Sequence, residues 1–339
     1  MTEQTSTNYA ARINARRLIL GPSDDLMAIS PMKHTWSNGV WDMMMASTWF
    51  PSEINLGNDI GDYKHKLTDG ERFMYDKALA FLSNLDGIQF NNLVHNIGTH
   101  ITSPEVSMLI SRQAFEEAVH VKSYAAMIEA VSLDPMSVYL TFERDGLLAA
   151  KNEYILKQSR ALSGNFSPRQ FALALVSNVL LEGVYFFSGF LAFYILARNG
   201  KMLGSCDMIR YIQRDEEQSH LTLFKNMLDT MRVENPEVFT AEFWAEATQL
   251  FRDAVEMETN WGKYIISGGV LGVTPQIIDD YIKSLANERA DLIGMAQPYP
   301  GVVNPLPWVK EFSNPNGVES NFFETKVTSY AVGGTLDWD

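Results

Sequence analysis

Residues 171–197 read FALALVSNVLLEGVYFFSGFLAFYILA, and Glu182 is the one charged residue in this run of twenty-seven. At about 1.5 Å per residue, a helix of this length could span a bilayer, so a transmembrane helix is one interpretation. The other is a helix buried on all sides in a large soluble protein, with the Glu182 carboxylate held inside because something binds it. The choice between them decides the function.

The acid inside this run favours the buried helix. A carboxylate in the middle of a lipid-facing helix is costly. We therefore expect a central core helix with Glu182 directed inward, and no membrane partner.

The composition sets further bounds. The chain has 339 residues, 46% of them hydrophobic and 20% charged, so it can bury a large core. Its net charge of −14 argues against a nucleic-acid partner, which needs clustered Lys and Arg. One cysteine, Cys206, cannot form an internal disulfide, and the N-terminus lacks the apolar core of a signal peptide. These features predict a reducing, cytoplasmic location.

Apolar periodicity and capping signals predict an all-α fold. Thr68 and Glu71 have capping-box spacing, and Ser103-Pro104 and Ser167-Pro168 place proline at the first helical position. No run alternates as a strand would. The expected helices cover about 70–97, 104–132, 136–161, 168–198, 207–233, 241–266 and 275–295. We predict one domain with an N-terminal arm and short helices (1–67), a helical bundle (68–295) and a C-terminal tail (296–339).

Two of these helices carry a Glu-x-x-His pair, Glu117 with His120 and Glu217 with His220. Residues three apart share one helix face, so each pair can offer an oxygen and a nitrogen to the same ion. One such pair is more often a solvated helix face. Here, however, the preceding helices supply Asp86 and Glu182, which completes the ligand set of a dinuclear helical bundle.

The charges agree with two divalent cations, because four carboxylates would balance them in a dry core. Mixed oxygen and nitrogen donors suit iron or manganese better than a structural zinc site, which favours thiolates.

Tyr124 lies on the same stripe as Glu117 and His120, at i, i+3 and i+7. A helical tyrosine is usually part of the core. Beside an oxygen-activating metal pair it can also lose one electron and its phenolic proton to form a neutral radical. Phe186, Phe190 and Ile212 would then wall off that radical.

Several segments together resemble the small, radical-generating subunit of class I ribonucleotide reductase. They are TWFPSEI (48–54), LSNLDGIQ (82–89), RQAFEEAVHVKSY (112–124), LLEGVYFFSGF (180–190), YIQRDEEQSH (211–220) and NFFETKVTSY (321–330). The resemblance extends from about residue 15 to the C-terminus, and no single segment carries it. It implies a ferritin-like bundle that forms a homodimer. It also implies an oxygen-bridged pair of iron ions, activated with O2 and a reductant, and a tyrosyl radical passed to a large catalytic subunit on which the tail docks.

The resemblance also implies roles for individual residues. The radical falls on Tyr124, and the long-range transfer route falls on Trp49, Asp215 and Tyr330. Without the resemblance, those last three would be interpreted as a core ring, a helix-face charge and a loop aromatic. The implied metal ligands are Asp86, Glu117, His120, Glu182, one of Glu216 and Glu217, and His220.

Two departures from the family pattern matter. The motif Arg-Asp-Glu-x-x-His is one residue longer here, so counting from its start selects Glu216 and counting back from His220 selects Glu217. We prefer Glu217 on helical spacing, although a π-bulge could absorb the extra residue, and this preference puts the role of Asp215 in doubt. The second departure concerns related proteins that replace the radical tyrosine with phenylalanine and use manganese with iron. Tyr124 and Asp86 favour iron, with manganese in one or both positions as the alternative.

Two other functions use similar ligands. A di-iron oxidase or monooxygenase would act directly on an organic substrate and would not need Tyr124 or the tail. A ferritin-type iron store would bind iron without being an enzyme, and it would need to assemble into a cage.

Overall fold

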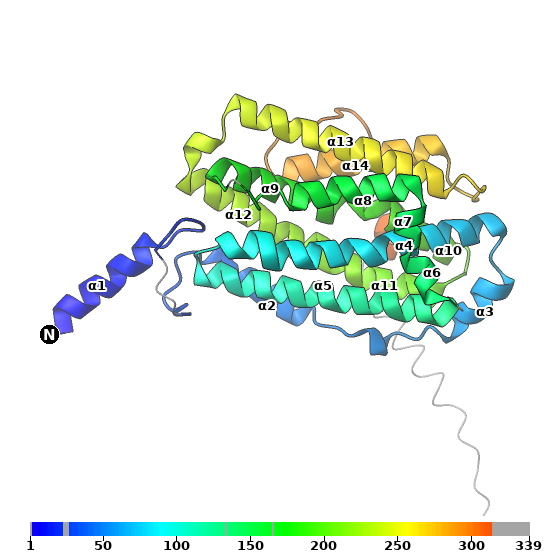
Figure 1. The fold of residues 1–339 in the computed structure, drawn as a ribbon, viewed down its shortest axis with the longest axis horizontal. Helices are drawn as coiled ribbons and strands as arrows, with labels where there is room; N and C mark the ends of the chain where they lie inside the picture. The colour runs from blue at the N-terminus through cyan, green and yellow to red at the C-terminus, as the bar shows by residue number, and fades with distance from the viewer. Residues whose placement is uncertain (1, 23–26, 133, 165, 314–339) are drawn as a thin grey trace, which may run out of the picture.

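The computed structural model describes residues 2–22, 27–132, 134–164 and 166–313, and within them the chain forms helices and no strand (Figure 1). The single bridge in these residues pairs Ile19 with Ile101. The all-α prediction is confirmed. The division into an arm, a bundle and a tail stays a prediction, and residues 314–339, including Tyr330, lie outside the described part.

The bundle is built from long helices that pack side by side. Helix α4 packs on α5 and α10, α9 packs on α12, and α13 packs on α14 (Figure 1). Their bounds are α4 Asp69–Asn92, α5 Pro104–Val131, α9 Pro168–Leu180, α10 Phe187–Arg198, α11 Leu203–Arg214, α12 Leu221–Glu234, α13 Ala241–Ile265 and α14 Pro275–Leu292.

Shorter elements surround the bundle. They are α1 Thr2–Ala15, α2 Trp36–Ala46, α3 Gly57–His65, α6 Pro135–Tyr139, α7 Thr141–Arg144, α8 Gly146–Ser159 and α15 Val309–Ser313, with single 3₁₀ turns η1 Pro51–Glu53, η3 Gly98–His100 and η6 Pro236–Val238. Helix α1 projects away from the bundle, with the N-terminus at its far end (Figure 1).

Local capping explains where helices begin. At the start of α4, Thr68 Oγ1 accepts from the Glu71 amide at 3.2 Å, and Glu71 Oε2 accepts from the Thr68 amide at 2.8 Å, as the capping-box spacing predicted. The single helix predicted over 136–161 is wrong. Asp145 interrupts it, because its side chain accepts from the amides of Leu147 and Leu148 and starts α8 as a new helix.

In the part of the chain that the structure describes, three helices contain a π-helical segment, namely η2 Leu93–Ile97, η4 Leu181–Tyr185 and η5 Asp215–His220. Segment η4 interrupts the apolar helix between α9 and α10, and η5 lies between α11 and α12. Such segments accommodate an extra residue and are frequent at functional sites. Two of the three carry acids that the sequence predicted as metal ligands.

The helical stretch Pro168–Arg198 is long and apolar enough to cross a membrane, yet its most apolar 18 residues are 100% buried inside the protein. The run that contains Glu182 is therefore a core helix, as predicted.

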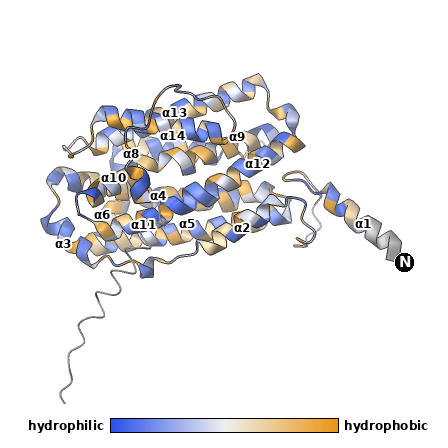
Figure 2. Ribbon diagram, turned by 180° about the vertical axis from the view of Figure 1, so that it is seen from behind, coloured by the Kyte–Doolittle hydropathy of each residue, from blue (hydrophilic) through white to orange (hydrophobic). Residues whose placement is uncertain are grey.

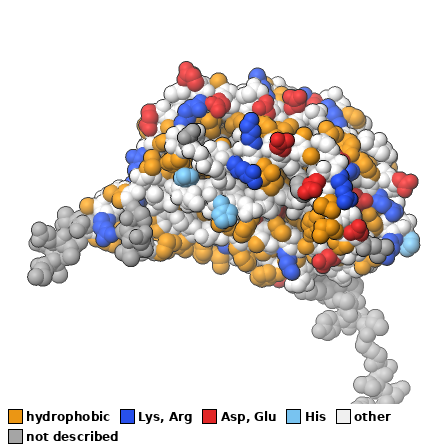
Figure 3. All heavy atoms as spheres, viewed as in Figure 1, with side chains coloured by type: hydrophobic (Ala, Val, Ile, Leu, Met, Phe, Trp, Pro, Cys, Tyr) orange, Lys and Arg blue, Asp and Glu red, His pale blue; other side chains and the backbone are white. Residues whose placement is uncertain are grey.

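The surface around the bundle is mixed in polarity and charge. Hydrophilic and hydrophobic residues alternate on outer helices such as α13 (Figure 2), and acidic and basic side chains lie interspersed on the face shown in Figure 3.

A buried ion pair joins α8 to α13 beside this core helix. Lys151 donates to Glu258 and, at 3.2 Å, to the Tyr185 carbonyl, while Glu258 accepts from the Ser188 amide at 2.8 Å. Burial lowers the pKa of Lys151 to about 8 although Glu258 opposes the shift, and burial raises the pKa of Glu258. Each charge is therefore tolerated only because the other lies beside it.

Replacing Lys151 with methionine should leave the Glu258 carboxylate buried without a counter-charge. We expect Lys151→Met to lower the free energy of unfolding by about 3–5 kcal/mol, measured by urea denaturation of the metal-free protein. Adding Glu258→Gln should restore most of the loss, because glutamine still accepts from Ser188 but carries no charge.

The deficit of the single variant should depend on pH. The folded pKa of Glu258 lies above its unfolded value, so the folded state binds the extra proton and Glu258 favours folding most at low pH. The deficit of Lys151→Met should therefore be smaller at about pH 5 than at about pH 8. An equal deficit at both values, unchanged by Glu258→Gln, would contradict this account of the pair.

Candidate metal centre

Six fully buried side chains converge in the middle of the bundle. They form two overlapping groups whose potential ligand atoms lie within 4.8 Å of one another: Asp86, Glu117, His120 and Glu216 in one, and Glu117, Glu182, Glu216 and His220 in the other. Glu117 and Glu216 belong to both groups. Two adjacent ion positions bridged by two shared glutamates are the arrangement of a dinuclear carboxylate centre.

Helix spacing accounts for the way each pair is presented. On α5, Glu117 Oε2 lies 3.5 Å from His120 Nδ1, at i and i+3. On η5, Glu216 Oε2 lies 3.2 Å from His220 Nδ1, at i and i+4. Asp86 comes from α4 and Glu182 from η4, so four separate segments of the bundle supply the cluster.

The preference for Glu217 as a ligand does not agree with this geometry. Glu217 points away from the cluster, with its Oε1 2.6 Å from a terminal nitrogen of Arg289 and its side chain 32% exposed. The π-helical segment is the reason, because its wider turn brings the residue four positions before His220, Glu216, onto the inner face. The π-bulge that the longer motif allowed is therefore present.

Unpaired polar atoms show that the cluster fits metal ions. Both oxygens of Asp86, Glu117 Oε2, His120 Nδ1 and Glu216 Oε1 are buried and have no hydrogen-bond partner. Leaving such atoms unpaired in a dry core is costly, and cations would satisfy them together. Four carboxylates neutralise two divalent ions, and this oxygen and nitrogen donor set suits iron or manganese.

The pKa shifts agree with a site that exchanges protons for metal. Burial raises the pKa of Asp86 well above its usual range, and repulsion by Glu117 raises it further. Burial lowers the pKa of His120, but the hydrogen bond with Asp215 and the nearby carboxylates of Glu117 and Glu216 outweigh burial and raise the pKa well above the ordinary value. Metal binding must therefore release protons from this cluster.

Two further acids orient the histidines. Asp215 Oδ2 lies 3.3 Å from His120 Nε2, and Glu116 Oε2 lies 3.0 Å from His220 Nε2. Asp215 directly precedes Glu216, and Glu116 directly precedes Glu117, so each acid lies next to a glutamate shared by both groups and contacts the histidine of the other helix. Such a partner fixes the ring and leaves its second nitrogen for the metal. Sequence reasoning missed Glu116, although the doublet Glu116-Glu117 parallels Asp215-Glu216.

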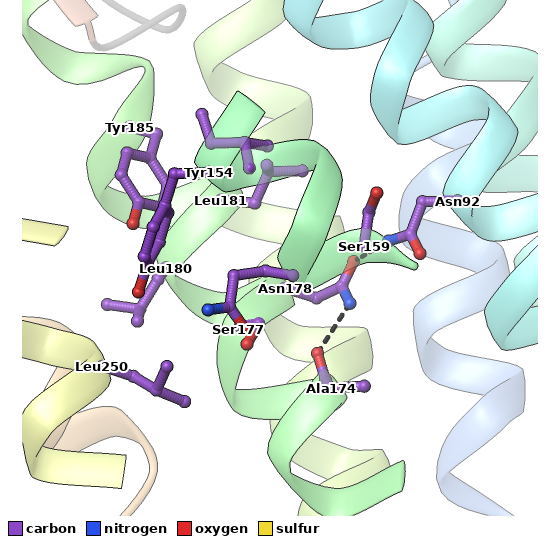
Figure 4. A pocket seen from close by; sticks show the side chains of 12 residues that line it. Asn92, Tyr154, Ser159, Ala174, Ser177, Asn178, Leu180, Leu181, Tyr185 and Leu250 are labelled. Atoms are coloured by element: carbon purple, nitrogen blue, oxygen red, sulfur yellow. Dashed lines mark hydrogen bonds between the residues drawn. The ribbon is translucent and has the colours of Figure 1, made fainter. Parts of the chain in front are cut away.

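Two amides that sequence reasoning also missed hold Glu182. Gln113 Nε2 donates to Glu182 Oε1 at 2.8 Å, and Gln89 Nε2 donates to the same oxygen. Gln89 also donates to Asn178 Oδ1 at 3.1 Å, and Asn178 lines a small pocket with Asn92 (Figure 4). None of the six clustered side chains lines this pocket, so the pocket is not itself the centre.

Tyr124 is fully buried on α5, and its hydroxyl has no hydrogen-bond partner. Burial raises its pKa well above the ordinary value, and the negative charge of Asp86 is the next largest cause. Phe186, Phe190 and Ile212 are also fully buried, and the two phenylalanine rings stack with centroids 5.6 Å apart. Tyr124 itself is excluded from solvent, and the role of Phe186, Phe190 and Ile212 as the wall around its ring stays a prediction.

Trp49 connects to the cluster through Asp215. Its Nε1 donates to Asp215 Oδ2 at 2.7 Å, and the same oxygen faces His120 Nε2. Its ring also stacks on Tyr211, with centroids 5.1 Å apart. The extra residue in the motif therefore does not displace Asp215 from the position between Trp49 and His120.

The site places this chain in the class of dinuclear metal proteins. In that class, four carboxylates and two histidines meet inside a helical bundle. The family model "Ribonucleotide reductase, small chain" matches residues 26–305, and the chain belongs to that family. Its place in the family implies a large-subunit partner.

Individual relatives match the chain over most of its length. The chain is 36% identical over 329 residues to the ribonucleoside-diphosphate reductase subunit beta of Treponema pallidum, and the alignment covers 96% of this chain and 93% of the relative. It is 33% identical to the subunit beta of Halalkalibacterium halodurans, over 93% of this chain and 91% of the relative. A solved ribonucleotide reductase R2 subunit from Clostridium botulinum matches with a TM-score of 0.84 and 36% identity, covering 88% of this chain and 94% of that one.

The two neighbouring glutamates should respond differently to removal. Glu216→Ala should bind fewer than two equivalents of Mn²⁺ at saturation, because both ion positions lose a shared ligand. Glu217→Ala should still reach two equivalents, because its carboxylate faces Arg289. Metal analysis after equilibrium dialysis measures the number of Mn²⁺ equivalents that each variant binds. If Glu217→Ala lost one equivalent while Glu216→Ala still bound two, the assignment would be reversed.

Proposed function

We propose that this small subunit binds two iron ions at the cluster and, with O2 and an external reductant, oxidises Tyr124 to a neutral radical. The oxidising equivalent then passes to the large subunit, where ribonucleotides are reduced to deoxyribonucleotides. The Tyr124 hydroxyl carries the proposal, because it is fully buried, without a hydrogen-bond partner, and close enough to Asp86, Glu117 and Glu216 for their charges to raise its pKa.

Two ferrous ions bound at the cluster would supply electrons to O2 and leave the site able to accept one electron from Tyr124. The raised pKa keeps the phenol protonated at neutral pH, so loss of the electron must be accompanied by loss of the proton. The resulting radical is uncharged, which suits a dry site. The buried rings of Phe186 and Phe190 exclude water and reductants from it.

The hydrogen-bonded series His120, Asp215 and Trp49 is the proposed start of the transfer route to the large subunit. Burial raises the pKa of Asp215, but the hydrogen bond with His120 and the charges of His120 and Arg214 outweigh burial and lower the pKa below the usual value. Asp215 therefore stays ionised. An ionised Asp215 can accept from both rings at once. Tyr330, the proposed last member on this chain, lies outside the described residues.

The cluster binds iron in this proposal, and manganese in one or both positions is the variant that the same donors would allow. We further propose that the subunit acts as a homodimer in the cytoplasm. Residues 296–339 would dock on the large subunit.

Replacing Tyr124 with phenylalanine removes one oxygen and no metal ligand. Tyr124→Phe should lose the organic radical signal in electron paramagnetic resonance while it retains two metal ions. Tyr194→Phe is the matched control, because Tyr194 is equally buried but donates to Gln213 at 2.6 Å. A Tyr124→Phe protein with the wild-type radical signal would refute the assignment.

Removing residues 331–339 should leave the Tyr124 radical intact and weaken binding to the large subunit by at least about 100-fold, if the tail supplies the main contacts. Surface plasmon resonance on the immobilised large subunit measures this, and Tyr124→Phe should bind normally as the control. Unchanged affinity of the shortened chain would exclude the docking role.

A further inference from the structure

Arg289 on α14 contacts both π-helical segments that carry ligands of the centre. Its Nε donates to the Gly183 carbonyl of η4 at 3.2 Å, and a terminal nitrogen donates to Glu217 Oε1 of η5 at 2.6 Å. Gly183 directly follows Glu182, and Glu217 directly follows Glu216. One guanidinium therefore holds the immediate neighbours of two cluster glutamates.

Arg289 and Lys151 both donate side-chain hydrogen bonds to the backbone of η4. A π-helical turn departs from the regular i to i+4 bonding, and buried carbonyls in it still need donors. Arg289 supplies one at Gly183, and Lys151 supplies another at Tyr185, at 3.2 Å. Cationic side chains from α8 and α14 therefore both donate to the backbone of η4.

Gly183 makes the close approach of Arg289 feasible. A Cβ atom at this position would lie 2.8 Å from Arg289 Nε and 2.9 Å from its Cγ and Cδ. The aliphatic stem and the guanidinium therefore occupy the space that a side chain at position 183 would fill. The guanidinium also lies 5.2 Å from the ring centroid of Phe187, one residue beyond the wall residue Phe186.

We propose that Arg289 is a positioning residue that fixes η4 and η5 relative to each other, so that Glu182 and Glu216 both face the ion pair. Glu217 is its counter-ion. This inference rests on the proposed metal-binding function. Arg289 acts through the backbone of η4 and the side chain of Glu217, and within the described residues no hydrogen bond or ion pair joins it to any of the six clustered side chains.

The test measures backbone opening and metal affinity separately, in the full chain. Hydrogen exchange of the metal-free protein, followed by mass spectrometry, reports on peptides covering 181–185 and 215–220. Arg289→Met should speed exchange by about 10- to 100-fold in both segments, as expected for loss of charge-assisted hydrogen bonds. Titration with Mn²⁺ should show affinity weakened by about 10- to 100-fold, with two ions still bound at saturation.

Two further variants sharpen the result. Glu217→Ala removes the η5 contact of Arg289, together with the 3.2 Å hydrogen bond from Gln213 Nε2 to Glu217 Oε2, and leaves the Gly183 contact in place. It should therefore speed exchange in 215–220 more than in 181–185. Combining it with Arg289→Met should weaken Mn²⁺ binding by less than the product of the single effects, because both remove the same interaction. Arg252→Met, at an exposed arginine of α13, is the matched control and should change neither measurement.

The outcomes separate this inference from the proposed function. If the wild-type chain fails to bind two Mn²⁺ ions, the proposed function fails, and the exchange measurement still tests Arg289. Wild-type exchange in either segment of Arg289→Met, or an equal rise throughout the bundle, would overturn the positioning role. Should Arg289→Met not fold, Glu217→Ala decides, and unchanged exchange in 215–220 would overturn it.

Discussion

The structure depends on keeping four carboxylates and two imidazoles together in a core from which water is excluded. Such a cluster is unfavourable by itself, as the raised pKa of Asp86 shows, and it is stable only where protons or cations balance it. The long packed helices supply the dry surroundings. Hydrogen bonds donated by Gln89 and Gln113, together with the contacts of the Asp215 and Glu116 carboxylates with the two histidines, then orient the clustered side chains.

Periodicity was sufficient to predict the features that follow the regular α-helix. A lone acid in a long apolar run identified Glu182, and the i, i+3 spacing identified Glu117 with His120, because α5 is regular across that pair. The same rule failed at Glu217, where η5 changes the number of residues per turn. The break at Asp145 was missed for a related reason, since a capping side chain leaves little trace in the apolar pattern.

Contacts between distant segments were beyond the reach of the sequence pattern. Glu116 meets His220 across 104 positions, and Arg289 meets Gly183 across 106. Nothing in the local spacing of these residues names the partner, because packing of the whole bundle brings them together. The family resemblance implied candidate ligands and Tyr124 as the radical site, but the residues that contact those candidate ligands became visible only in three dimensions.

The two histidines have matching acids but different surroundings beyond them. Glu116, which holds His220, pairs with Arg112 at 3.1 Å, whereas Asp215, which holds His120, also binds the indole of Trp49. An indole can be oxidised under biological conditions and a guanidinium cannot. The proposed ligand set is nearly symmetric, but of these two contacts only the one on the His120 side includes a group that can be oxidised. The proposed transfer route would therefore leave the centre in one direction.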